Sequence, residues 1–130
     1  MPTEDTCQPQ VLTALQKDGW TITGQQIYIL KGEHAVFIDI EAVKEDQQTF
    51  IEVKCFPENN TSTEFYIAVG QYFVYRHILS TQKPHHTLYL AIPEDTYDAL
   101  TDVYYDTLHD NHVKLVIVNI EMEIVIRWIE

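Results

Sequence analysis

The feature that most limits the fold is a near-continuous apolar run, Thr87-Leu-Tyr-Leu-Ala-Ile, which Pro93 ends. A run of this kind is typical of a strand that is buried on both faces. Helical patterns precede and follow it, one from about residue 61 to about Ser80 and one from about Thr96 to Leu108. These segments predict an α/β protein in which helices flank a mixed β-sheet.

Further helix and strand patterns complete this prediction. Val11, Ala14 and Leu15 recur at helical spacing before Gly19, which predicts a first helix that ends there. Asn59-Asn60-Thr61, with Glu64 three residues after Thr61, predicts a capped start for the helix that runs to Ser80. Alternating or apolar segments predict strands at 20–30 (broken or bulged at Gly24), 35–41, 49–56, 87–92, 113–118 and 122–128. The expected order is αβββαβαββ, in one domain over residues 1–130.

Composition excludes several classes of protein. No stretch approaches the roughly 20 apolar residues of a membrane span, and the start of the chain, Met1-Pro-Thr-Glu-Asp, is too acidic for a secretory signal. Two cysteines are too few for a disulfide scaffold, which favours a reducing, cytoplasmic setting. We expect Cys55 to be a small buried apolar residue and Cys7 to be a thiol near the chain terminus. A net charge of −12 argues against a general nucleic-acid binder.

Carboxylates and a lysine share one face of two neighbouring strands. Alternation places Glu52 and Lys54 on the same side of one strand, and Asp39 and Glu41 on the same side of the other. A hairpin folded symmetrically about Glu45–Asp46 would set position 39 opposite 52, and 37 opposite 54. Asp39 and Glu52, with Glu41 as an extra ligand, are therefore candidates to hold Mg²⁺ or Mn²⁺ for phosphodiester cleavage. Lys54 would then orient the attacking water or stabilise the transition state; the alternative is an ordinary surface ion pair.

The following helix offers two further candidates. Gln71 and Tyr75 lie at i, i+4 spacing and so share one helix face. Gln71 could donate to a phosphate or to a metal-bound water, and Tyr75 could shape the same pocket. The alternative is that both side chains simply pack their apolar parts on the sheet.

Asp39, Glu52-Val-Lys54 and Gln71-x-x-x-Tyr75 together resemble the PD-(D/E)XK nuclease superfamily, in its variant with a Gln-x-x-x-Tyr motif. More narrowly, the chain resembles the XisH family, the cyanobacterial fdxN element excision controlling factors. The segments that carry this likeness are Ala14-Leu-Gln-Lys-Asp-Gly-Trp-Thr-Ile-Thr23, Phe37-Ile-Asp39, Ile51-Glu-Val-Lys-Cys-Phe56, Gly70-Gln-Tyr-Phe-Val-Tyr-Arg76, Leu88-Tyr-Leu-Ala-Ile-Pro-Glu94 and Trp128. The resemblance implies a restriction-endonuclease-like fold and a role in programmed DNA excision during heterocyst development. It also implies two partners, a recombinase and a sister control factor.

The distribution of charge leaves two functions open. No carboxylate lies between Glu64 and Glu94, whereas acidic residues recur every four positions from Glu94 to Asp110. That acidic stripe is expected to face water or a basic partner. Retention of Asp39, Glu52, Lys54 and Gln71 favours a metal-dependent endonuclease. The scarcity of Lys and Arg, only 8 in all, favours a non-catalytic factor that reaches DNA through a partner. The sequence leaves the oligomeric state open, including self-association.

Overall fold

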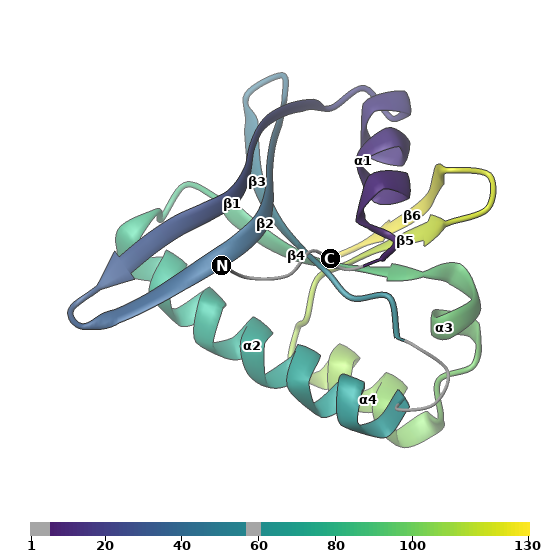
Figure 1. Ribbon diagram of the computed structural model, residues 1–130. Helices are drawn as coiled ribbons and strands as arrows, with labels where there is room; N and C mark the ends of the chain where they lie inside the picture. Colours follow the sequence, from purple (N-terminus) through teal and green to yellow (C-terminus); the bar gives the residue numbers. More distant parts are fainter. Residues whose placement is uncertain (1–5, 57–60) are drawn as a thin grey trace.

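The computed structural model describes residues 6–56 and 61–130, and its centre is a six-stranded sheet with the order β1-β2-β3-β4-β5-β6 (Figure 1). The strands are β1 (Thr21–Lys31), β2 (His34–Lys44), β3 (Gln47–Val53), β4 (Thr87–Pro93), β5 (Leu115–Asn119) and β6 (Ile124–Ile129). β4 pairs in parallel with β3 and with β5, and the other neighbours are antiparallel. The mixed sheet predicted from sequence is confirmed.

Helices cover both faces of the sheet. They are α1 (Gln8–Lys17), α2 (Thr61–Gln82), α3 (Glu94–Asp98) and α4 (Asp102–Asp110). Figure 1 shows α1 on one side of the sheet and α2 with α4 on the other. β4 is buried along its centre, from Leu88 to Ile92, as its apolar run predicted, because helices lie on both of its faces.

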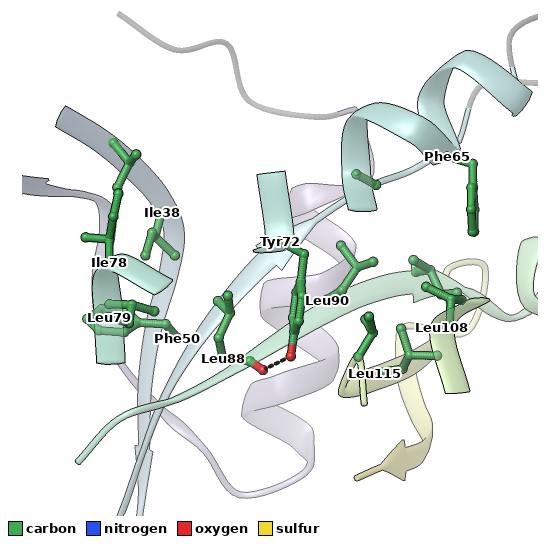
Figure 2. Packing of buried hydrophobic residues seen from close by; sticks show 14 of the residues in the cluster. Ile38, Phe50, Phe65, Tyr72, Ile78, Leu79, Leu88, Leu90, Leu108 and Leu115 are labelled. Atoms are coloured by element: carbon green, nitrogen blue, oxygen red, sulfur yellow. Dashed lines mark hydrogen bonds between the residues drawn. The ribbon is translucent and has the colours of Figure 1, made fainter. Parts of the chain in front are cut away.

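The core has two parts, one on each side of the sheet. On the α1 side, Val11, Ala14 and Leu15 of the helix pack with apolar residues of the sheet. On the α2 side, Tyr72 is the largest fully buried side chain, and its hydroxyl donates to the carbonyl of Leu88 at 2.9 Å (Figure 2). The backbone N–H of Lys114 donates to the same hydroxyl at 3.1 Å, so Tyr72 links α2 to β4 and to the residue that precedes β5.

The prediction of one continuous helix from Thr96 to Leu108 is wrong, because two helices, α3 and α4, occupy this region. Thr101 has an extended backbone, and its hydroxyl accepts from the N–H of Tyr104 at 3.4 Å, so it begins α4 as an N-cap. The predicted apolar residues still face the core, and Leu108 is buried. The acidic stripe is therefore divided between α3 and α4, and its members from Asp98 onward are exposed.

The two cysteines differ from expectation. Cys7 and Cys55 form a disulfide, so the prediction of two unlinked thiols is wrong. The pairing is not visible in the sequence, because 48 positions separate the residues and the fold alone brings their Cα atoms to 5.8 Å. The predicted capping residues Asn59 and Asn60 lie outside the described residues. Among the helices that the structure describes, each is too short or too polar to cross a bilayer.

Candidate functional site

The site begins where β2 and β3 part. The hairpin turns at Glu45–Asp46, and Lys44 pairs with Gln47, so the register predicted from sequence is confirmed. The ladder ends at the pair Ile40 and Ile51. The predicted direct pairing of Asp39 with Glu52, and of position 37 with 54, is absent from this ladder. The strands diverge just where the two carboxylates lie.

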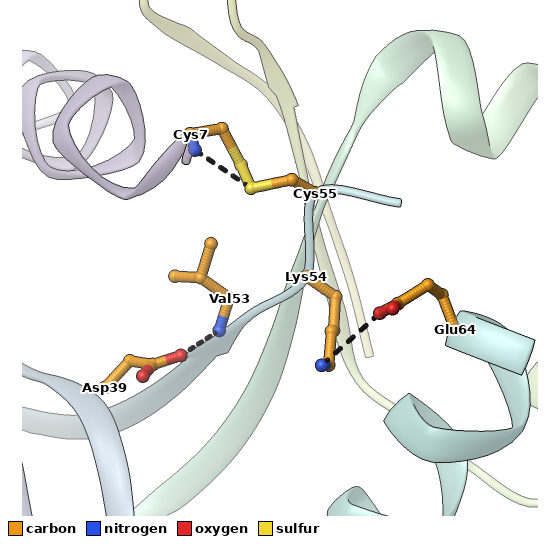
Figure 3. The surroundings of a disulfide bond; sticks show 6 residues. All are labelled: Cys7, Asp39, Val53, Lys54, Cys55 and Glu64. Carbon is orange, nitrogen blue, oxygen red and sulfur yellow. Dashed lines mark hydrogen bonds and ion pairs between the residues drawn. A yellow bond between two sulfur atoms is a disulfide. The ribbon is translucent and has the colours of Figure 1, made fainter. Parts of the chain in front are cut away.

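Side chains replace the missing ladder bonds. The backbone N–H of Val53 donates to Oδ2 of Asp39 at 2.7 Å, and the backbone N–H of Asp39 donates to Oε1 of Glu52 at 3.2 Å (Figure 3 shows the first of these). Gln26 on β1 adds a third bond, from Nε2 to Oδ1 of Asp39 at 3.2 Å. Both carboxylates are thereby fixed at the point of divergence, Asp39 with 9% and Glu52 with 6% of its surface exposed.

The side of the sheet on which β2 packs its apolar side chains changes at the same point. Val36 and Ile38 pack on the α2 side, whereas Ile40 packs on the α1 side, although simple alternation would put all three on one face. Opposite Asp39, Gln26 has a φ of 51°, a left-handed conformation that bends β1. Strict alternation therefore does not hold across Asp39.

Glu41 lies beyond the point at which β2 changes sides, away from the other candidates. Its Oε2 lies 3.0 Å from Nε2 of His86, and its Oε1 accepts from the hydroxyl of Thr23 at 3.1 Å. It does not line the cavity that Asp39 and Glu52 share. The structure thus does not bring this proposed third metal ligand to the site.

A cavity of about 710 Å³ brings the other candidates together. It lies between the β2 and β3 strands and the helix α2. Its wall includes all five residues expected from sequence to act in catalysis, namely Asp39, Glu52, Lys54, Gln71 and Tyr75. Residues from three separate elements, 13 to 36 positions apart, therefore converge on one space.

Glu52 is a strongly perturbed acid at the site. Burial, and after it the negative charge of Asp39, raises the pKa of Glu52 to about 9; the charge of Lys54 opposes this only in part. At neutral pH the protein alone therefore keeps a proton on Glu52. A bound cation would offset the repulsion between Asp39 and Glu52 and allow both carboxyl groups to ionise.

The α2 residues complete the polar wall. Burial, followed by the charges of Glu52 and Asp39, raises the pKa of Tyr75 to about 12, so its hydroxyl stays a proton donor at neutral pH. The amide oxygen of Gln71 is buried and, among the described residues, has no hydrogen-bond partner. An acceptor in this position needs a donor or a cation from outside the chain.

Lys54 completes the set from the end of β3. Its ammonium lies 3.6 Å from Oε2 of Glu64 in the first turn of α2 (Figure 3). The lysine side chain is only 14% exposed. Glu64 thus holds the lysine at the rim of the cavity in the protein alone.

The donor set fits a hard divalent cation. Carboxylate and amide oxygens are what Mg²⁺ and Mn²⁺ prefer, and Mg²⁺ usually keeps several waters beside one or two protein carboxylates. The described residues contain no group of three or more His, Cys, Asp or Glu placed to hold a metal. Asp39 and Glu52 would therefore hold such an ion incompletely and leave positions for water or phosphate.

Sequence reasoning missed three participants. Gln26 fixes Asp39, Glu64 binds Lys54, and His34 lines the cavity from the start of β2. Gln26 gives no sequence signal, because a left-handed residue in a strand is usually glycine or asparagine. Glu64 was assigned only to a helix cap.

Comparison with known proteins identifies the family of this chain. A family model described as XisH protein matches residues 1–126. An XisH family protein from Nostoc punctiforme PCC 73102, solved by crystallography, is 35% identical with a TM-score of 0.92, over 97% of this chain and 100% of that one. An fdxN element excision controlling factor protein from Anabaena variabilis is 34% identical with a TM-score of 0.93, over 98% and 100%. No curated protein matches. Both the family model and the full-length structural likeness lead to one conclusion: this chain belongs to the XisH family.

Proposed function

We propose that this chain helps to control the site-specific excision of a DNA element, the role named for its relative from Anabaena variabilis. We further propose that it does so through a PD-(D/E)XK nuclease-like site with the chemistry of phosphodiester hydrolysis. The observation that supports this is the convergence of Asp39, Glu52, Lys54, Gln71 and Tyr75 on one cavity.

Each side chain has a role that its chemistry suits. Asp39 and Glu52 would hold a Mg²⁺ or Mn²⁺ ion, which would neutralise charge that builds on the phosphate. Lys54 would leave Glu64 for the phosphate or for the attacking water, since both carry oxygen acceptors. Tyr75, a donor at neutral pH, would bind a non-bridging phosphate oxygen. Gln71 would orient a water molecule through its free amide oxygen.

DNA would reach this site through a basic partner. The chain carries a net charge of −12, and duplex binding normally requires several Lys or Arg side chains. The sister control factor and the recombinase of the excision system are the partners that we propose, with self-association as a further possibility for test.

A second function is favoured by the same charge. In it, the nuclease scaffold is kept but cuts no bond, and the protein acts by binding its partner. The acidic residues exposed on α3 and α4 suit contact with a basic protein better than contact with a duplex.

A nicking assay separates the two functions. Supercoiled plasmid carrying the element's ends is incubated with Mg²⁺ or Mn²⁺ and the protein, with and without its partners. The variants are Glu52→Gln and Lys54→Met, and the matched control is Glu41→Gln, which alters a carboxylate of β2 outside the cavity.

The nuclease function predicts relaxation of the plasmid by wild type and by Glu41→Gln. Glu52→Gln and Lys54→Met should each lower the rate by at least about 100-fold. If all four proteins leave the plasmid intact in the presence of the partners, yet excision in cells still requires the chain, the non-catalytic function is correct.

A further inference from the structure

The disulfide lies directly beside the candidate site. Cys55 follows Lys54 in the chain, and its sulfur is bonded to that of Cys7 at the start of α1 (Figure 3). Lys54 itself lines the cavity, and its ammonium faces Glu64 across from β3. A change at Cys55 is therefore transmitted to the lysine by a single peptide unit.

The disulfide anchors the segment in which β3 leaves the sheet. The strand ends at Val53, and the backbone N–H of Lys54 donates to the carbonyl of Ala91 at 3.0 Å. Cys55 is then bonded to Cys7, whose helix is fixed to the sheet through its buried Val11 and Leu15. The bond thus ties the lysine-bearing segment to α1, on the far side of the sheet from α2.

The surroundings of the bond would stabilise the thiolate that exchange with an external thiol releases. The backbone N–H of Cys7, at the N-terminus of α1, donates to Sγ of Cys55 at 3.0 Å. The same donor and the helix dipole would stabilise a thiolate on Cys55 once the bond is opened. A thiolate so stabilised is a good leaving group when another thiol attacks Cys7. Because only 7% of Cys7 is exposed, that attack requires local opening around the bond. In cytosolic proteins, where thiols are kept reduced, the disulfides that do form are usually transient and catalytic or redox-sensing.

We propose that the Cys7–Cys55 pair is a redox modification site that sets the position of Lys54 in the cavity. Two low-molecular-weight thiols reduce the bond by exchange: the first attacks one sulfur and releases the other as a thiolate. The second thiol then displaces the first as an external disulfide, which leaves both cysteines as thiols. Once the disulfide is reduced, residues 54–56 are no longer tied to α1, and the side chain of Lys54 becomes more mobile. This inference rests on the proposed function, because the redox state of the pair would regulate the same site.

The test measures the reactivity of Lys54 without any need for activity. Oxidised and dithiothreitol-reduced wild type are treated with an amine-acetylating ester, and acetylation of Lys54 is followed by mass spectrometry against that of exposed Lys83. Reduction should raise the relative labelling rate of Lys54 at least about threefold, because the ammonium is then less well protected. The double variant Cys7→Ser/Cys55→Ser should show the faster rate with or without dithiothreitol.

A parallel titration with Mn²⁺ distinguishes failure of the inference from failure of the proposed function. Equal labelling of Lys54 in the oxidised and reduced wild type would overturn the redox inference, whatever the metal does. A redox-dependent labelling rate without Mn²⁺ binding in either form would instead overturn the metal-dependent function and leave the inference standing. Acetylation of Lys44, whose ammonium donates to the carbonyl of Asp18 at 2.7 Å, reports general unfolding in either protein: a rise at Lys44 equal to that at Lys54 would overturn the inference.

Discussion

Replacement of Glu52 by Gln should remove a large pH dependence of stability. The pKa of Glu52 is raised from 4.5 to about 9 in the folded protein, a difference of about 4.5 units, which corresponds to about 6 kcal/mol over the whole range. Because the folded-state pKa lies above the unfolded value, this stabilisation is complete below pH 4.5. It is lost as the pH rises toward 9.

The assay is urea unfolding, followed by circular dichroism at pH 5.5 and pH 8.5 without divalent ions. A slope of about 1.4 kcal/mol per pH unit predicts that the wild type loses about 4 kcal/mol over these three units relative to Glu52→Gln. Glutamine suits the comparison, since its amide can still accept from the N–H of Asp39 and donate to the Asp39 carboxylate. Subtracting one protein from the other cancels the titrating groups that do not interact with Glu52; Asp39, which does, is treated separately.

Equal slopes in the two proteins would refute the argument that Glu52 holds the proton. Asp39→Asn serves as the second variant, because coupled carboxyls titrate as a pair. If the pH dependence vanished only in Asp39→Asn, the shared proton would belong to Asp39 instead.

Three further predictions concern stability. Reduction of the Cys7–Cys55 disulfide, which spans 48 positions, should lower the free energy of unfolding by about 4 kcal/mol; urea curves with and without dithiothreitol test this, and coincident curves would contradict it. Tyr72→Phe should cost about 1–3 kcal/mol, because the N–H of Lys114 and the carbonyl of Leu88 lose a buried partner; an unchanged melting curve would argue against that network. Asp18→Ala should lower the free energy of unfolding by a similar amount and shift the tryptophan fluorescence, because one carboxylate oxygen of Asp18 accepts from the indole N–H groups of Trp20 and Trp128. Asp18→Asn, the control, keeps an acceptor and should show little shift.

Much of the fold follows from local patterns in the sequence. The apolar run of β4 predicted burial on both faces, and the polar turn at Glu45–Asp46 predicted the register of β2 with β3. These patterns succeed because burial and hairpin pairing depend on neighbouring residues. The break between α3 and α4 was missed, since the helical spacing of Tyr97, Leu100 and Tyr104 continues across the N-cap at Thr101.

The sequence predicts which residues line the site, but not the backbone geometry that arranges them. Asp39, Glu52 and Lys54 lie on strands whose pairing the sequence indicates, and Gln71 and Tyr75 share a helix face. The change of side in β2 at Asp39, which leaves Glu41 outside the cavity, accompanies a left-handed conformation at Gln26 that no propensity predicts. The disulfide likewise depends on the tertiary placement of α1 beside the end of β3.

The most direct test of the account is a calorimetric titration with Mn²⁺ at pH 7, in two buffers of different ionisation enthalpy. Because Glu52 holds a proton in the protein alone, metal binding should release about one proton per ion, and the measured heats should differ between the buffers accordingly. Glu41→Gln should behave as wild type does, whereas Glu52→Gln should bind Mn²⁺ much more weakly and without proton release. Absence of binding to the wild type, or equal binding by Glu52→Gln, would contradict the claim that Asp39 and Glu52 form a cation site.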